Sequence, residues 1–340
     1  MVPERRVDLK VIEGRGPRGG ATPVRPSWAR LPGDADSEPG LRPVDALFVG
    51  YLLGTAVLIL TLRNRLPGWP LYLALRLAAV ALVLRLVPLR PRNRALASVR
   101  DWYPVAAFVP LYAELGGLTH LFTSRTHDGF VSGLEGRLFG FQPSQMLHLL
   151  WPWPWLSEYL HFCYFYYYLV PLTLGLLLYL RGRRPQFSQA LTAILGVFVT
   201  CCAIFIAFPV AGPYHYFGHA APASLPGFFG PLVHGIVDRG SSVGTAFPSS
   251  HTAVAVCVWV TAWRLSRPAF WALAPVVPGL ALATVYGGFH YALDTLAGVV
   301  LGAQVALWAP RIHAAIRARM AGPPAGNAPR VSLPRAGGVD

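Results

Sequence analysis

The chain has 340 residues, of which 54% are hydrophobic and only 13% are charged. Soluble domains average about 25% charged residues, so the composition excludes an ordinary soluble protein and favours a membrane protein. The net charge of +14 is compatible with nucleic-acid binding. However, arginine also marks the cytoplasmic loops of membrane proteins, so we attribute the charge to topology and expect no nucleic-acid partner.

In chain order, residues 1–44 come first and are rich in Pro, Gly and Arg, which predicts a disordered cytoplasmic tail. Apolar runs of about twenty residues then recur and predict an all-α fold, a polytopic transmembrane helical bundle over residues 45–310. Residues 311–340 are predicted to form a second disordered cytoplasmic tail. We place eight spans at residues 45–62, 69–89, 102–121, 157–180, 187–209, 248–264, 269–288 and 290–309.

Two connecting stretches have a predicted structure of their own. Residues 145–156 contain three tryptophans alternating with prolines, which favours an interfacial or re-entrant element over a span. Gly287 and Gly288 predict a tight turn between the last two spans. The four cysteines lie inside apolar segments without metal-ligand spacing, so we interpret them as small core residues.

Arginine distribution predicts the orientation of the bundle. Most of the 29 Lys and Arg residues fall in the N-terminal tail, at 90–100, 181–184 and 264–267, and after 310. These segments lie on one side of an eight-span chain. By the positive-inside rule that side is cytoplasmic, so both termini are cytoplasmic in this predicted multi-pass protein of the cell membrane. The opposite, extracytoplasmic side then holds Arg63, Arg65, Arg125, Arg137 and Arg239.

Two histidines begin predicted spans on the extracytoplasmic side. His251 follows Pro248, Ser249 and Ser250 at a helix start, where serine caps well and free backbone N–H groups suit a phosphate. A histidine at that position is able to donate a proton to a leaving oxygen. The interval of 39 residues to His290 fits two crossings of a bilayer, so both histidines are expected at one site.

His290 and Asp294 are four residues apart and lie on one helix face. A carboxylate bonded to one imidazole nitrogen fixes the tautomer and leaves the other nitrogen free to act as a nucleophile. The pattern therefore predicts phosphoryl transfer without a metal or cofactor. His290 attacks phosphorus, Asp294 orients it, His251 protonates the leaving group, and Ser249 and Ser250 hold phosphate oxygens.

These stretches resemble a known family over roughly residues 100–310. The run FPSSH, ending at His251, resembles the second motif of the type 2 phosphatidic acid phosphatase superfamily, and His290 to Asp294 with the following Leu-Ala-Gly resembles the third. The resemblance implies a six-helix phosphatase-type core, with a proton donor at His251, a phosphohistidine at His290 and an orienting Asp294. Residues 134–140, 158–168 and 208–214 resemble the inositol phosphorylceramide synthase branch, and Tyr214 is a candidate substrate contact there.

The chain departs from the family pattern at two cationic positions. The first motif needs a lysine, but the only lysine is Lys10, and Arg184-Pro185 is predicted to face the cytoplasm. The family's arginine six residues before His290 is replaced by Thr284. Candidate substitutes on the outer side are Arg239, which we favour, together with Arg137 and Arg125.

We therefore expect an enzyme that acts on a lipid phosphate or phosphodiester at the extracytoplasmic face. Its partners are a phospholipid substrate, membrane lipids and an alcohol acceptor, as in an inositol phosphotransferase. The alternatives are a lipid phosphate phosphatase that uses water as acceptor and, in another class, a membrane transporter with a His–Asp proton relay. Nothing in the sequence predicts an oligomeric state.

Other polar residues have competing interpretations. His215 and His219, with His234 or Asp238, are a possible zinc set or a possible substrate contact, but we prefer a position on the loop surface. Residues 164–168 predict an aromatic belt rather than a headgroup site. Glu114 is expected to form a structural ion pair with Arg76 or Arg137 rather than to act in catalysis. His127 and Asp128 are possible contacts to a polar acceptor.

Overall fold

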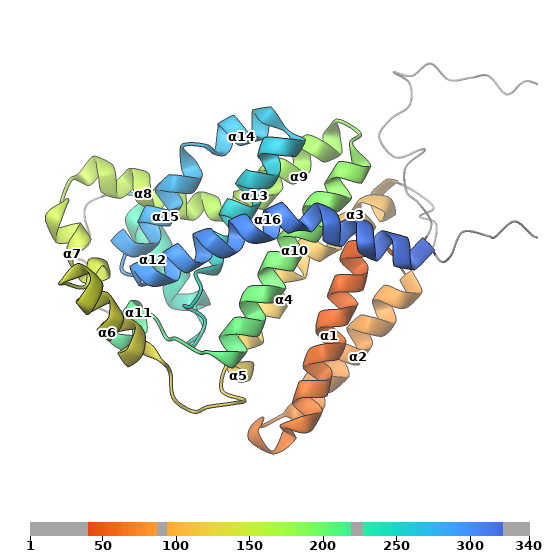
Figure 1. Ribbon diagram of the computed structural model, residues 1–340, viewed down its shortest axis with the longest axis horizontal. Helices are drawn as coiled ribbons and strands as arrows, with labels where there is room; N and C mark the ends of the chain where they lie inside the picture. The colour runs from red at the N-terminus through yellow and green to blue at the C-terminus, as the bar shows by residue number, and fades with distance from the viewer. Residues whose placement is uncertain (1–39, 87–93, 219–226, 322–340) are drawn as a thin grey trace, which may run out of the picture.

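The computed structural model describes residues 40–86, 94–218 and 227–321. These ranges form helices joined by short turns, and their one β interaction is an isolated parallel bridge between Val210 and Thr245 (Figure 1). The predicted all-α bundle is confirmed. The helices are α1 (Pro43–Thr61), η2 (Arg63–Arg65), α2 (Trp69–Leu86), α3 (Arg94–Ala106), α4 (Phe108–Ala113), α5 (Leu115–Leu118), α6 (Asp128–Phe139), α7 (Pro143–Leu150), α8 (Pro154–Tyr166), η3 (Tyr167–Leu169), α9 (Val170–Leu180), α10 (Arg184–Ala207), α11 (Pro213–Tyr216), α12 (Phe229–Gly240), α13 (Ser250–Leu265), α14 (Arg267–Leu273), α15 (Val276–Tyr286) and α16 (Ala292–Ala321).

Five helical segments in the described ranges are long and apolar enough to cross a membrane, as expected of a membrane protein. Each overlaps one predicted span, and two of them join consecutive helices, α8 to α9 and α14 to α15. Their bounds are Pro43–Thr61, Pro154–Leu180, Arg184–Ala207, Arg267–Tyr286 and Ala292–Met320.

The remaining three predicted spans have local features that set them apart. Helix α2 carries Arg76 and Arg85, and the segment from α3 to α5 changes helix at Ala107 and Glu114. Helix α13 has 16 residues, or about 24 Å at 1.5 Å per residue, which is shorter than a hydrocarbon core of about 30 Å. The total of eight spans therefore stays a prediction.

The predicted tail boundaries differ from the helix ends. Helix α16 continues to Ala321, eleven residues past the predicted boundary at 310. This extension contains several alanines and arginines, which are strong helix formers. The rest of the two predicted tails, residues 1–39 and 322–340, lies outside the described residues.

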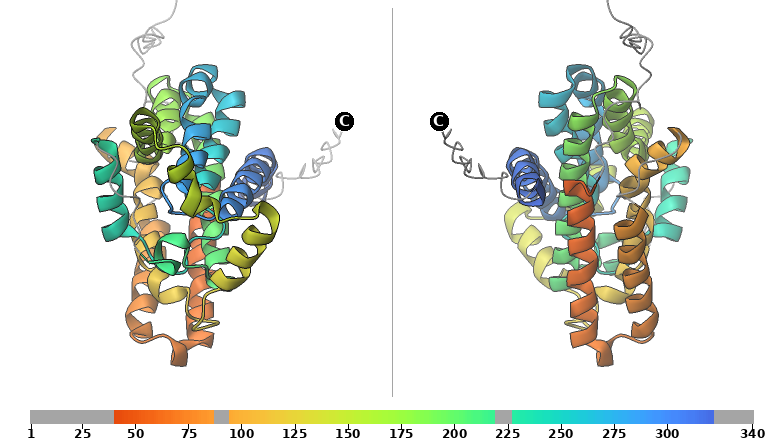
Figure 2. Two further views of the ribbon diagram at one scale, coloured as in Figure 1. Left: turned by 90° about the vertical axis from the view of Figure 1, so that its left-hand side faces the viewer. Right: turned by 90° about the vertical axis from the view of Figure 1, so that its right-hand side faces the viewer.

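The helices pack around α10, α13 and α16. Helices α1 and α2 form a hairpin on one side of the molecule, α6, α7 and α8 lie at the other end, and α16 passes across the middle against α10 and α13 (Figure 1). Seen from the ends, α12 and α16 lie on opposite flanks (Figure 2). The turn between α15 and α16 contains Gly288 at φ +72°, which confirms the predicted turn at Gly287 and Gly288.

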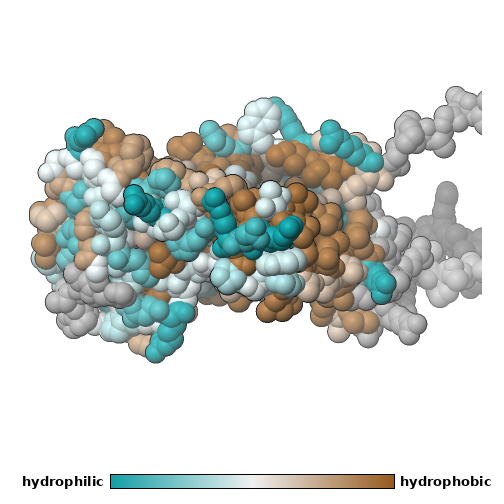
Figure 3. All heavy atoms as spheres, turned by 90° about the horizontal axis from the view of Figure 1, so that it is seen from below, coloured by the Kyte–Doolittle hydropathy of each residue, from teal (hydrophilic) through white to brown (hydrophobic). Residues whose placement is uncertain are grey.

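The outer surface of the hairpin is apolar. Val57 on α1 is 64% exposed, and Leu71 and Leu75 on α2 are 64% and 61% exposed. Figure 3 shows broad hydrophobic areas on one face of the molecule, broken by hydrophilic patches. Such surface is unfavourable in water and suits contact with lipid chains. The four cysteines are buried, as predicted.

Two ion-pair groups lie away from the histidines. Arg76 is buried and its guanidinium lies 2.7 Å from the Glu114 carboxylate, which confirms one of the expected pairs. Arg184 pairs with Asp101 at 3.2 Å at the first turn of α10. Since the 24 residues of α10 rise about 36 Å, Arg184 lies a full helix length from Phe208, which neighbours the histidine site.

Helices α13 and α16 approach closely through glycine. A Cβ at Gly298 would lie 2.6 Å from the Ser249 carbonyl oxygen, and one at Gly302 would overlap the Ala253 carbonyl. Small residues allow this kind of backbone contact in membrane helices. The approach matters for the site because Ser249 begins the turn that carries His251.

We expect Gly298→Ala to lower the thermal unfolding midpoint and the turnover of the purified protein. The added methyl group forces α13 and α16 apart, at a cost of about 1–3 kcal/mol. Gly196→Ala on α10 is the matched control, since its Cβ would meet Val305 at an ordinary 3.8 Å. Equal midpoints for the two variants would show that the α13–α16 approach is not tight.

Candidate active site

The turn before α13 presents His251 at the start of a capped helix. The Ser249 hydroxyl accepts a hydrogen bond from the Thr252 N–H at 3.3 Å, so Ser249 is the N-cap, as predicted. Ser249 and Ser250 are both buried. Free N–H groups in the first turn of a helix favour an anion, so this turn is suited to hold phosphate oxygens.

His290 lies in the short loop between α15 and α16. Its Nδ1 is 3.1 Å from the Ala246 carbonyl oxygen and 3.6 Å from Asp294 Oδ2. Because a carbonyl oxygen only accepts, Nδ1 carries the proton and Nε2 has the lone pair. His290 therefore has the tautomer that a nucleophile requires.

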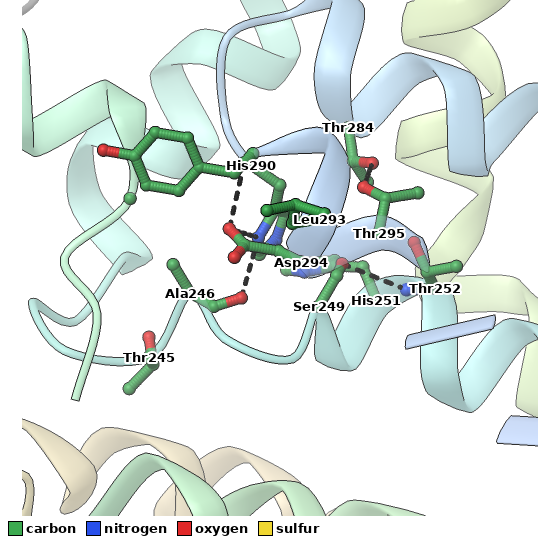
Figure 4. A network of polar contacts seen from close by, with 12 residues as sticks. Thr245, Ala246, Ser249, His251, Thr252, Thr284, His290, Leu293, Asp294 and Thr295 are labelled. Carbon is green, nitrogen blue, oxygen red and sulfur yellow. Dashed lines mark hydrogen bonds and ion pairs between the residues drawn. The ribbon is translucent and has the colours of Figure 1, made fainter. Parts of the chain in front are cut away.

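The two histidines meet as the sequence interval predicts. Their ring centroids are 5.7 Å apart with the planes inclined at 61°. The Asp294 main-chain carbonyl accepts a hydrogen bond from the Ser249 N–H at 2.9 Å and so ties the start of α16 to the start of α13. Figure 4 shows His290, Asp294 and Ala246 converging beside the Ser249–Thr252 turn.

The Asp294 carboxylate is fully buried and has two neighbours. Oδ2 accepts a hydrogen bond from the Tyr291 N–H at 2.9 Å, in addition to its 3.6 Å approach to His290. The Ala246 carbonyl is the closer partner of His290. Asp294 thus supplies the negative charge beside the imidazole, whereas Ala246 fixes the tautomer.

We expect Asp294→Asn to lower kcat by less than the roughly 10⁴-fold loss seen when a carboxylate alone sets a histidine's tautomer. An asparagine oxygen is still able to accept from Tyr291, and Ala246 keeps the proton on Nδ1, so only the charge is lost. Steady-state turnover of a phosphate ester measures the effect. A loss as large as that of His290→Ala would mean that Asp294, and not Ala246, sets the tautomer.

Asp128 supports the segment that carries Ala246. Its two carboxylate oxygens accept hydrogen bonds from the N–H groups of Ala211 and Gly212, both at 2.8 Å. The neighbouring Val210 carbonyl accepts from the Ala246 N–H at 2.9 Å. Asp128 therefore acts through the backbone on the carbonyl that orients His290. From the sequence, Asp128 was a possible contact to the acceptor substrate, and its role in positioning Ala246 was not predicted.

Glu135 on α6 is a second buried carboxylate beside the site. Oε1 accepts a hydrogen bond from the Leu293 N–H at 3.0 Å, at the first turn of α16. Burial raises the pKa of Glu135 to about 7, and the nearby Asp294 charge acts in the same direction. Glu135 lies in the run that resembles inositol phosphorylceramide synthases, but the sequence alone gave it no role.

The aromatic run on α8 and η3 faces His251. The rings of Tyr164 and Tyr167 lie 5.0 and 4.4 Å from the His251 ring, and the Tyr164 hydroxyl is 3.3 Å from Nε2. Tyr164 is 3% exposed. The aromatic-belt prediction is therefore wrong for Tyr164, because its ring is buried in the protein interior against the His251 imidazole.

The predicted phosphate cations lie on the surface. Arg239, near the end of α12, is exposed and donates to the Gly235 carbonyl of its own helix at 2.9 Å. Arg137 and Arg125 are also exposed. Tyr214 is buried, its hydroxyl donates to Asp238, and its ring centroid lies 5.9 Å from that of Phe289, next to His290.

Thr284 stands where the family pattern has arginine. Its hydroxyl forms a 2.8 Å hydrogen bond with Thr295, and its carbonyl accepts from the His290 N–H at 2.9 Å. Thr284 thus holds the His290 loop against α16. Thr284 therefore has a structural role at this position, and that role does not require a charged side chain.

The described members of the possible zinc set, His215, His234 and Asp238, do not form a metal-binding group. His215 hydrogen-bonds Ser241 through Nε2 at 3.1 Å. Within the described ranges, no group of three or more His, Cys, Asp or Glu side chains is arranged to hold a metal ion. His219 lies outside the described residues.

Comparison with known families decides the identity of this arrangement. The model of the PAP2 superfamily matches residues 131–308, just over half of the chain. The chain belongs to the PAP2 superfamily. The match runs from α6 to α16 and includes both histidines and Asp294. No curated protein and no solved structure matches the chain significantly.

Membership of the PAP2 superfamily makes the protein a phosphatase or phosphotransferase enzyme, with lipid phosphates as the substrate class that the family suggests. The transporter alternative is therefore dropped. The PAP2 match does not reach α1 to α5, which hold the Arg76–Glu114 pair.

Proposed function

We propose that the protein is an integral-membrane phosphoryl-transfer enzyme that works through a phosphohistidine on His290. The observation that carries this proposal is the pair of imidazoles 5.7 Å apart, with the proton of His290 held on Nδ1 by Ala246. A free Nε2 beside a second histidine provides a nucleophile and a proton donor in one site.

The reaction has two steps. In the first, His290 Nε2 attacks phosphorus, the bond from phosphorus to the leaving oxygen breaks, and His251 gives that oxygen its proton. In the second, an acceptor hydroxyl attacks phosphorus and gives its proton to His251, while the phosphorus–nitrogen bond breaks. Both histidines return to their starting state.

Ser249 and Ser250 are the proposed phosphate-binding turn, and an arginine is proposed to balance the phosphate charge. Arg239 and Arg137 are the candidates, with Tyr214 as a further substrate contact. Both arginines have long, exposed side chains. We therefore expect bound substrate to bring one guanidinium to the phosphate. If Arg239→Ala left turnover and phosphate affinity unchanged, Arg239 would not be that cation.

Between the two reaction classes we favour transfer to an alcohol, as in an inositol phosphotransferase. On a phosphodiester such as phosphatidylinositol, diacylglycerol leaves and the headgroup phosphate stays on His290 until an acceptor hydroxyl attacks. The packing of Tyr164 and Tyr167 on His251 supports this choice, since aromatic rings around the proton donor limit the access of water.

Product analysis separates transfer from hydrolysis. Purified protein is given labelled phosphatidylinositol and labelled phosphatidic acid, each with and without an added alcohol acceptor, beside the His290→Ala variant. A new phosphorus-labelled lipid that needs the acceptor supports transfer. Release of free phosphate from phosphatidic acid, unaffected by acceptor, identifies the alternative, a lipid phosphate phosphatase.

The proposed orientation puts both termini in the cytoplasm and the histidines on the extracytoplasmic side of the cell membrane. The arginine distribution supports this arrangement. A reporter that is active only outside the cytoplasm, fused after residue 340, is expected to be silent. Activity of that fusion would place the site on the cytoplasmic side.

A further inference from the structure

A groove of about 680 Å³ adjoins the active site, between α6, the end of α10 and α16. Thirteen described residues line it, and Gln304 is the only one of them with a polar side chain. Water gains few hydrogen bonds in such a space, so the groove favours an apolar occupant.

The groove begins at the catalytic residues. Pro248 and Leu293 form part of its wall and are adjacent in sequence to Ser249 and Asp294. The Leu293 N–H also donates a hydrogen bond to the Glu135 carboxylate. A molecule whose phosphate lies at His290 therefore has the mouth of the groove directly beside it.

The groove opens toward the lipid. Phe130, Leu296 and Val300 line it and are 67%, 54% and 55% exposed. Two of its walls, α10 and α16, belong to segments that are apolar and long enough to span a membrane. Its opening is therefore expected to face lipid chains, and a peptide backbone would find few hydrogen-bond partners there.

We propose that this groove binds one acyl chain of the lipid substrate, with the substrate phosphate at His290. The inference rests on the proposed function. From Leu293 to Gln304 the groove follows twelve residues of α16, or about 16 Å of helix. An acyl chain fits this shape because it is narrow, apolar and attached at one end to a phosphate-bearing headgroup.

Chain length tests the inference on the unmodified protein. For monoacyl glycerol phosphates of increasing length, kcat/KM is expected to rise about fourfold per added methylene, the equivalent of ~0.8 kcal/mol, until the groove is filled. A soluble aryl phosphate serves as the reference substrate. A flat series, with the soluble ester still turned over, would overturn the acyl-chain site and leave the proposed function standing.

Two matched tryptophan variants locate the effect. Leu296→Trp places a larger ring in the groove, whereas Leu307→Trp lies on the same stripe of α16, is similarly exposed at 58%, and does not line the groove. We expect the ratio of kcat/KM for the long-chain lipid to that for the soluble ester to fall at least tenfold in Leu296→Trp and to stay unchanged in Leu307→Trp. Equal ratios in the two variants would contradict the assignment.

Photolabelling does not depend on how well a variant folds. A phosphatidic acid with a diazirine at the end of one acyl chain is irradiated with the wild-type protein in detergent, and the labelled peptides are sequenced. Labels in residues 130–134 or 293–304 support the inference. Labels confined to α1 and α2 indicate surrounding lipid only and overturn it, and absence of turnover of every phosphate ester would instead remove the proposed function.

Discussion

Replacing His290 by alanine is expected to abolish catalysis, with a loss of roughly 10⁴-fold or more in kcat for every phosphate ester. In our account His290 forms the covalent bond to phosphorus, and the structure offers its Nε2 for that bond by holding the proton on Nδ1. Turnover of a lipid phosphate and of a soluble aryl phosphate measures the effect.

The control for this variant is His120→Ala, which removes an exposed histidine in the segment after α5. It is expected to retain wild-type turnover. Thermal unfolding of both variants shows whether the fold is kept. A folded His290→Ala protein with substantial activity would rule out a covalent role for His290.

Replacing His251 by asparagine is expected to lower kcat by about 10²–10⁴-fold on a lipid phosphate, the usual worth of a general acid. The loss should be much smaller on p-nitrophenyl phosphate, because nitrophenolate is a stable anion and leaves without a proton. Asparagine keeps a polar group between the Tyr164 and Tyr167 rings, so the packing around the site is largely retained.

Comparison of the two substrates distinguishes a proton donor from a structural residue. If His251 only supported the fold, the asparagine variant would lose activity on both substrates to the same extent. Equal losses would therefore contradict its role as general acid while leaving His290 unaffected.

The helices and the histidine pair could be predicted from the sequence because both depend on local patterns. Apolar runs of span length set the helices, and Ser249 before His251 predicted a capped helix start that the structure confirms. The interval from His251 to His290 then needed only the rise of a helix and the thickness of a bilayer.

The surroundings of the pair could not be predicted because they depend on contacts between distant segments. Asp128 reaches Ala246 through the backbone of residues 210–212, and Tyr164 contacts His251 across 87 positions of sequence. A tyrosine of an aromatic run and an aspartate at a helix start have the same local pattern whether they face lipid, solvent or an active site.

The consequence of the missing family arginine could not be predicted from the sequence either. The resemblance to the family motif predicts an arginine at the position of Thr284, but only the structure shows that Thr284 bonds Thr295 and holds the His290 loop. The candidate cations Arg239 and Arg137 are exposed on α12 and α6, so we expect any contribution from them to require bound substrate. Local sequence contains no information on that rearrangement.

Trapping of the phosphorylated enzyme tests the central claim most directly. The purified protein is mixed briefly with a ³²P-labelled lipid phosphate, quenched in alkali and digested, and the labelled peptide is sequenced. We predict one label that is stable in alkali, lost in acid and located on His290, and that is absent from His290→Ala. A label on another residue, or turnover without any trapped phosphoenzyme, would contradict the account.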